Sequence, residues 1–172
     1  YNGTVNADNS TWSIDVAGAD LAADTSFVAT VTGSDAAGNP FTATDTSTHT
    51  VDTAAAATIT VNNITADDIL NAAEAAGTIT VTGTVSGDAA SGDPVSFTIN
   101  GTPYSGTVNA DNSTWSIDVA VADLQADTSF VATVTGTDAA GNPFTATDTS
   151  THTVDTAAAA TITVNNITAD DI

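Results

Sequence analysis

The residues best suited to chemistry lie in one short acidic segment, Asp67–Glu74. It holds three carboxylates, Asp67, Asp68 and Glu74, together with the side-chain amide of Asn71. Calcium takes roughly six to eight oxygen ligands of these kinds, and a Glu at the end of a loop can bind it through both carboxylate oxygens. The segment therefore predicts a calcium loop. The alternative is a solvated acidic turn in which Asp67 or Asp68 caps a short helix that follows.

Residues for catalysis are scarce by comparison. The chain has no Cys and no Lys, and its two His residues, His49 and His152, each stand in a Thr-His-Thr sequence. Nucleophilic catalysis needs an activated nucleophile beside a base, and no Gly-x-Ser-x-Gly elbow is present to supply one. Each His is predicted to lie on a strand surface. We therefore expect no enzymatic activity.

The charge of the chain restricts its partners. Lys and Arg are absent, while 21 acidic residues give a formal net charge of −21. Binding to nucleic acid through its phosphates requires basic side chains, so that class of partner is excluded. No apolar run is long enough to cross a membrane, so direct membrane insertion is not expected either. Cations, and calcium in particular, are the natural partners of such a surface.

The chain is internally repeated with a period of 103 residues. Tyr1–Ile69 recurs as Tyr104–Ile172, and only four positions differ between the two copies. Repetition at a fixed period identifies a tandem array, in which one structural unit is copied along the chain. The four pairs of differing residues are Asn2 and Ser105, Gly18 and Val121, Ala22 and Gln125, and Ser34 and Thr137.

Apolar and polar residues alternate over most of the repeat, as in Val95–Ile99 and Trp115–Val119. This period is typical of half-buried strands, and turn residues separate about seven such runs. We therefore predict an all-β fold, an immunoglobulin-like β-sandwich of about seven strands per 103-residue unit. Two segments, Asp68–Ala76 and Ala120–Leu124, are predicted to form short helices or helical turns.

The Val-Asp-Thr-Ala sequence that begins at Val51 and again at Val154 marks the joints between units. It predicts three pieces: residues 1–53 as the C-terminal half of one repeat, 54–156 as a complete repeat, and 157–172 as the first strand of another. Residues 1–53 would then lack the first three strands of their sandwich. Such a half exposes an open edge and a core face. We therefore expect either that strands from a neighbouring repeat complete it, or that the sequence is one register of a longer continuous chain.

The sandwich topology also brings carboxylates together at the joints. Loops after the second and sixth strands lie where the chain enters an immunoglobulin-like domain, and the first connection lies where it leaves. Two groups are predicted: Asp52 with Asp88, Asp93 and Asp138 at the entrance, and Asp155 with Asp67, Asp68 and Glu74 at the exit. Calcium between them would convert repulsion between domains into a rigid joint. For Asp138 the alternative is a purely turn-forming role.

Four motifs in this order are similar to those of bacterial immunoglobulin-like extender repeats in giant repeats-in-toxin adhesins, as in an ice-binding adhesin of an Antarctic marine bacterium. They are Asp68–Glu74, Ser113–Ile117, Thr137–Asn142 and Val154–Thr156, and the resemblance covers the whole chain. It implies an array that calcium stiffens and that projects a distal adhesive module from the outer membrane. One departure is the run of four Ala after Thr156, where relatives often carry Thr and Pro.

The expected function is therefore a structural extender on the bacterial cell surface, in an extracellular position. Its partners would be identical adjacent repeats, while other domains of the protein bind the distal ligand and hold the outer membrane. The first alternative is a carbohydrate- or protein-binding module that acts through avidity, since every copy would carry the same site. The second is an acidic protein that stores calcium through many weak sites without changing shape.

Overall fold

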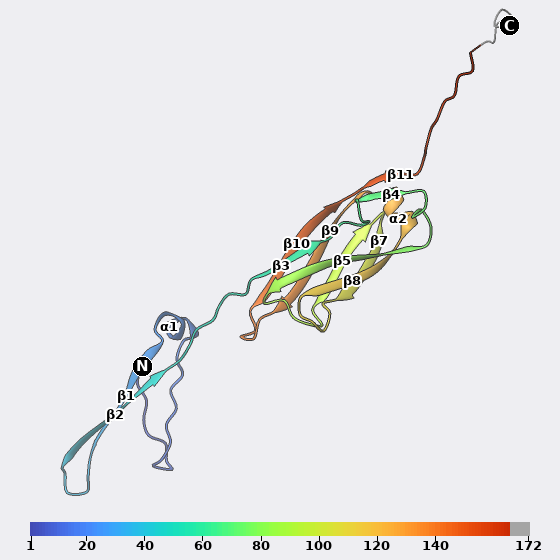
Figure 1. Cartoon of the computed structure of the whole chain (residues 1–172). Coiled ribbons are helices and arrows are strands. Elements are labelled where there is room, and N and C mark those ends of the chain that lie inside the picture. The colour runs from blue at the N-terminus through green and yellow to red at the C-terminus, as the bar shows by residue number, and fades with distance from the viewer. Residues whose placement is uncertain (166–172) are drawn as a thin grey trace, which may run out of the picture. The chain divides into compact units, whose positions relative to one another are not determined.

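Strands dominate the computed structural model of the chain, which describes residues 1–165 (Figure 1). The chain forms two units, the first made of residues 1–53 and the second beginning at Ala54. No helix in the described part of the chain has the length and apolar character needed to cross a membrane. Residues 157–165 carry no strand, and the rest of the strand predicted for 157–172 lies outside the described residues.

The second unit is an immunoglobulin-like sandwich, as predicted. One sheet has four strands in the order β10-β9-β6-β7 and the other has three in the order β3-β5-β8. Seven strands have five or more residues, and two short ones, β4 and β11, pair with each other. The elements are β3 (Ala57–Val61), β4 (Ile69–Asn71), β5 (Thr78–Gly87), β6 (Pro94–Ile99), β7 (Thr102–Thr107), β8 (Thr114–Ala120), α2 (Val121–Ala126), β9 (Ser129–Thr137), β10 (Pro143–Thr151) and β11 (Thr153–Asp155).

The core of this unit follows from the alternation of the strands. Every second residue of β6 is buried, and so is every second residue of β8 from Trp115 to Val119. Phe97 lies at the centre of an aromatic group, with ring centroids 4.8 Å from Phe130, 5.8 Å from Tyr104 and 6.1 Å from Trp115. Rings at these separations gain energy beyond their buried area, so this group ties the two sheets together.

The Trp115 side chain packs against Gly83 of β5 and Thr60 of β3. Its indole Nε1 donates a hydrogen bond to the backbone oxygen of Thr60, 3.1 Å away. A Cβ atom placed on Gly83 would lie 2.6 Å from Trp115 Cε2, so only a glycine leaves room for the ring. The repeat therefore pairs one large residue with one small residue across the β5–β8 ladder.

The predicted helix at Asp68–Ala76 is wrong. The segment contains the short strand β4 followed by turns, and both Asp68 and Gly77 adopt positive φ angles, of 61° and 89°. A left-handed residue at each end prevents a continuous helix. The second helical signal is correct, since α2 begins one residue after Ala120.

The prediction of a strand-surface His152 is also wrong. This residue is buried at the break between β10 and β11, and its Nε2 lies 2.8 Å from the backbone oxygen of Leu124. The hydrogen bond therefore fixes the end of α2 against the last strands. Its partner at Leu124 is itself fully buried.

Asp111 organises the turn between β7 and β8. Its Oδ2 accepts a hydrogen bond from the hydroxyl of Thr114 at 2.6 Å, and its Oδ1 accepts from the backbone N–H groups of Ser113 and Thr114. These bonds, the Thr114 hydroxyl foremost, lower the pKa of Asp111 from 3.8 to about 2. Hydrogen bonds to a carboxylate favour its charged form, so the turn is most stable when Asp111 is ionised.

We expect Asp111→Asn to remove this pH dependence. A group whose pKa is depressed on folding contributes stability above its unfolded pKa and loses it as the pH falls through the folded pKa. The native chain should therefore lose part of its thermal stability between pH 4 and pH 2, and protonation of Asp111 should account for a share of that loss. Melting curves of both proteins at a series of pH values should converge over this interval. A difference that stays constant down to pH 2 would contradict the assignment.

The first unit repeats the C-terminal half of this architecture. It contains α1 (Gly18–Ala23), β1 (Ser26–Ser34) and β2 (Pro40–Thr48), and β1 pairs with β2 in the register that β9 keeps with β10. None of its residues is buried. Its local fold is thus present, while the side chains that form a core in the second unit are accessible here.

Candidate metal site

Two segments far apart in the repeat meet where the chain leaves the second unit. The short strand β11 runs parallel to β4, which places Asp155 opposite Asn71 and Thr153 opposite Ile69 (Figure 1). The backbone oxygen of Asp68 accepts a further hydrogen bond from the N–H of Thr153 at 3.1 Å. Asp155 therefore lies beside the acidic segment that precedes β5.

Asn71 and Glu74 form a closed turn next to Asp155. Glu74 Oε2 accepts a hydrogen bond from the N–H of Asn71 at 3.2 Å, and Asn71 Oδ1 accepts from the N–H of Ala73 at 2.8 Å. Both side chains are half-buried, whereas Asp155 is exposed. The turn thus presents an amide oxygen and a carboxylate from a fixed backbone beside the carboxylate of β11.

Asp67 and Asp68 shape the loop that leads into β4. Asp68 Oδ1 accepts a hydrogen bond from the N–H of Ile64 at 2.9 Å, and Asp67 Oδ1 accepts from the Thr65 hydroxyl at 3.1 Å and the Ile69 N–H at 3.2 Å. One oxygen of each carboxylate is therefore used within the loop. The helix-capping alternative is removed for both residues, because β4 rather than a helix follows.

Asp88 and Asp93 lie at the other end of the unit, where the chain enters. Asp88 Oδ2 accepts a hydrogen bond from the N–H of Ala56 at 2.7 Å, which fixes the incoming chain to the end of β5. Asp93 Oδ2 accepts from the N–H of Ala90 at 2.8 Å and lies against Gly136 in β9. Both carboxylates therefore have structural roles within the second unit.

Asp138 closes the turn between β9 and β10. Its Oδ1 accepts hydrogen bonds from the N–H groups of Ala140 at 2.9 Å and Asn142 at 2.8 Å, and its Oδ2 accepts from the Asn142 amide. The Asn142 side chain is the main cause of a lowered pKa at Asp138. Asp52 belongs to the first unit, so its partnership with these carboxylates stays a prediction.

The donor chemistry at the exit suits calcium, because Asn71, Glu74 and Asp155 offer only oxygen atoms. Among residues 1–165, however, no three His, Cys, Asp or Glu side chains converge closely enough to hold a metal ion. What the structure shows at this end is the backbone pairing of Asn71 with Asp155 and the hydrogen bond from the Asn71 N–H to Glu74. The pairing of β4 with β11 could not be predicted from the sequence, because nothing in either short strand indicates its partner.

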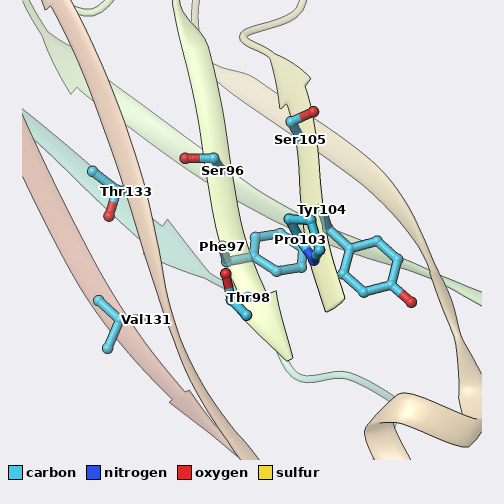
Figure 2. Close-up of a pocket in the computed structure, with 8 residues that line it drawn as sticks. All are labelled: Ser96, Phe97, Thr98, Pro103, Tyr104, Ser105, Val131 and Thr133. Carbon is cyan, nitrogen blue, oxygen red and sulfur yellow. The ribbon is translucent and has the colours of Figure 1, made fainter. Parts of the chain in front are cut away.

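A shallow pocket of about 550 Å³ lies on the four-stranded sheet (Figure 2). Hydroxyl groups and apolar side chains from β6, β7 and β9 line it, and none of the nine predicted calcium ligands does. Its lining has no charged residue, so it is chemically unlike an ion site. The lining residues are Ser96, Phe97, Thr98, Pro103, Tyr104, Ser105, Val131 and Thr133.

Three solved structures are similar to the chain in sequence and in fold. One, from work on host cell surface retention of a 1.5-MDa bacterial ice-binding adhesin, has 57% identity and a TM-score of 0.78 over 91% of this chain and 50% of that one. Another, a Ca2+-stabilised adhesin that helps an Antarctic bacterium reach out and bind ice, has 61% identity and a TM-score of 0.67. That match covers 93% of this chain and 39% of the adhesin chain.

The third is a bacterial immunoglobulin-like domain from the M. primoryensis ice-binding adhesin. It has 58% identity and a TM-score of 0.56, and the match covers 59% of this chain and 100% of that domain. The chain thus spans half or less of the first two structures and the whole of the third. No protein-family model and no curated protein matches it.

Proposed function

Because the chain belongs to the bacterial immunoglobulin-like adhesin domains, we propose that it is a structural extender repeat of a bacterial cell-surface adhesin. Calcium makes the array rigid, and the array projects a distal adhesive module from the cell. Adjacent repeats of the same chain are its partners, and other regions of the protein hold the outer membrane and bind the distal ligand. The repeat itself catalyses no reaction.

The observation that carries this proposal is the path of the chain through the second unit. The chain enters at β3 and leaves at β11, at opposite ends of the sandwich (Figure 1). Each repeat of this kind adds its own length to an array. A domain whose entry and exit points lay side by side would not. Near-identity between copies also favours a role in which every unit does the same task.

For calcium, we propose Asn71, Glu74 and Asp155 as the central ligands. The pairing of Asp155 with Asn71 in the β4–β11 ladder and the hydrogen bond from the Asn71 N–H to Glu74 support this choice. Asp67 and Asp68 would contribute from the same loop, each through the carboxylate oxygen that the loop does not use. Asp52, Asp88, Asp93 and Asp138 would act across the joint to the preceding repeat. A bound ion here supplies positive charge that offsets the repulsion between carboxylates.

We expect calcium to raise the melting temperature of the chain, and Asp155→Asn and Glu74→Gln to reduce that rise. An ion that binds only the folded form stabilises it by about 2.7 kcal/mol at a hundredfold excess over its Kd. The measurement is thermal unfolding in millimolar calcium and then in chelator, with scattering to record stiffness.

Asp118→Asn is the matched control for charge. Its carboxylate lies on β8, where it accepts a hydrogen bond from the Thr80 hydroxyl at 2.6 Å. This variant loses the same charge as Asp155→Asn, yet its response to calcium should equal that of the native chain. If calcium raises the melting temperature of all three variants equally, the proposed ligands are wrong. If calcium does not raise the melting temperature of the native chain, the chain does not bind calcium as proposed.

The second candidate is a binding module, and the pocket on β6, β7 and β9 is what favours it (Figure 2). Its hydroxyl groups suit a carbohydrate, but Phe97 is buried and offers no exposed aromatic platform. A glycan array probed with the chain separates the two functions. Saturable binding that Thr133→Val abolishes would favour the module over the extender.

A further inference from the structure

The outer face of the four-stranded sheet differs in chemistry from the rest of the second unit. In β6 and β9 buried residues alternate with more exposed Ser, Thr and Val, and the same alternation brings Ser and Thr to this side of β7 and β10. Successive side chains of a strand point to opposite faces, so these residues form one surface. We call the outward side chains of β6, β7, β9 and β10 the hydroxyl face. It carries no carboxylate, although the chain has 21 acidic residues.

The carboxylates of the second unit lie around the hydroxyl face rather than on it. Several lie in loops at the two ends of the sandwich, as Asp93 and Asp155 do, and Asp118 lies on the outer face of the other sheet. Asp148 belongs to β10 but points inward, where its Oδ2 accepts a hydrogen bond from the N–H of Val61 at 2.8 Å. A second chain with the same negative charge therefore meets the least repulsion at the hydroxyl face.

One row of hydroxyl groups crosses all four strands of this face. The register places Ser96 of β6 between Ser105 of β7 and Thr133 of β9 (Figure 2). Thr147 of β10 lies opposite Thr133 on the other side, and neighbouring strands are about 4.8 Å apart. Val131, which is 49% exposed, adds apolar surface to the same face. The face thus offers regularly spaced hydroxyl groups together with methyl groups.

The hydroxyl groups of the two outer faces differ in what they bond. On the three-stranded sheet they pair with each other across strands, as Thr58 does with Ser86 at 2.7 Å. Thr60 and Thr84 pair in the same way, also at 2.7 Å. On the hydroxyl face, no Ser or Thr hydroxyl bonds to another residue among residues 1–165. These groups are therefore available to a partner, whereas those of the other sheet are already engaged.

We propose that the hydroxyl face is a self-association surface, on which the same face of a second copy of the chain packs. Two sheets pack face to face about 10 Å apart, so that side chains of both fill the space between them. The unpaired hydroxyl groups would bond across the interface, while Val131 and the Thr methyl groups would supply apolar contact. No carboxylate would be brought into the contact from either copy.

The size of the face limits the strength of one contact. Four strands about 4.8 Å apart, with about seven residues of about 3.3 Å each, give roughly 400 Å² per copy. A stable dimer buries about 800 Å² per partner, so two chains should associate weakly and reversibly. In an array every repeat carries the same face, so weak contacts between two arrays would add. This last step rests on the proposed extender function, whereas association between two single faces does not.

The test is sedimentation equilibrium of the full chain over a concentration series that reaches about 1 mM, where weak specific binding is detected. Excess chelator prevents calcium from bridging carboxylates of different chains, and added salt screens the general repulsion between them. We expect reversible dimers whose fraction rises with the concentration of the chain. The fraction should also rise with ionic strength, because the face itself carries no charge to be screened.

Ser96→Asp and Ser116→Asp form a matched pair of variants. Each replaces an exposed Ser within a strand by a carboxylate, so the net charge and the strand propensity change alike. Ser96 lies on the hydroxyl face, and Ser116 lies on the outer face of the three-stranded sheet. Ser96→Asp should raise the Kd of the dimer at least roughly tenfold, because it places like charges opposite each other. Ser116→Asp should associate as the native chain does.

A second readout does not depend on the charged variants. The chain has no Cys, so Ser96→Cys and Ser116→Cys each carry a single thiol. A thiol-reactive cross-linker with a short flexible spacer should link Ser96→Cys into dimers much faster than Ser116→Cys. Melting curves followed by circular dichroism verify that all four variants fold.

The proposal is overturned if the native chain stays monomeric in chelator and salt, or if Ser96→Asp associates as tightly as Ser116→Asp. Equal cross-linking of the two Cys variants would overturn it as well. Dimers that form only with calcium would assign the contact to carboxylates, and a monomer that binds neutral glycans through Thr133 would assign the face to a carbohydrate. None of these outcomes decides whether calcium raises the melting temperature of the chain, so the two proposals fail separately.

Discussion

We expect Trp115→Ala to lower the free energy of unfolding of the second unit by about 3–5 kcal/mol, the usual cost of removing a buried aromatic side chain. The same substitution at Trp12, in an identical stretch of sequence, should change stability by only about 0.5 kcal/mol or less. The two residues share their neighbours along the chain from Gly3 to Val16 and from Gly106 to Val119. Any difference between them is therefore tertiary in origin.

The physical reason is what each indole contacts. Trp115 packs on Phe97, fills the space left by Gly83 and donates a hydrogen bond to Thr60. Its removal would leave a cavity and would take away the hydrogen bond to the Thr60 backbone oxygen. Urea unfolding of the two variants, followed by far-ultraviolet circular dichroism, gives the unfolding midpoint of each. Equal losses at the two positions would contradict the difference in burial between Trp115 and Trp12.

The largest loss of stability should come from Val134→Asp. Val134 is fully buried in β9, so a carboxylate there would have neither solvent nor a basic partner, in a chain that has no Lys or Arg. The expected cost exceeds about 4 kcal/mol, which is enough to unfold many domains of this size.

Val131→Asp is the control, since it lies in the same strand with its side chain exposed. It adds the same charge and loses the same β-branched residue, so its effect should stay within about 1 kcal/mol. Urea midpoints of the two variants measure the contrast. A loss at Val131 as large as that at Val134 would mean that β9 is inserted in the other register, with its opposite face in the core.

Periodicity alone was sufficient to predict the sandwich and most of its core. Val95, Phe97 and Ile99 alternate with polar residues, and all three are buried. The repeat length and the turn residues gave the correct fold class for the same reason, since each strand must expose one polar face. Neither inference requires knowledge of which strands are neighbours.

Contacts between distant segments explain what could not be predicted. The Asp68–Ala76 segment has the composition of a helix start, but pairing with β11 and the left-handed backbone at Asp68 override it. His152 stands in a polar Thr-rich sequence, yet the end of α2 covers it. The meeting of Asn71 and Asp155 depends on the same parallel pair, so the calcium ligands could be proposed from sequence only through an assumed topology.

The short parallel pair of β4 and β11 determines how the second unit responds to a pulling force. Tension transmitted along an array would pull Ala54 and Asp155 away from each other, and at the exit it would act along β11. Hydrogen bonds between β11 and β4 lie across that direction, so the pull would slide one strand past the other and strain these bonds together rather than in succession. An extender built this way resists stretching at the point where one repeat passes force to the next.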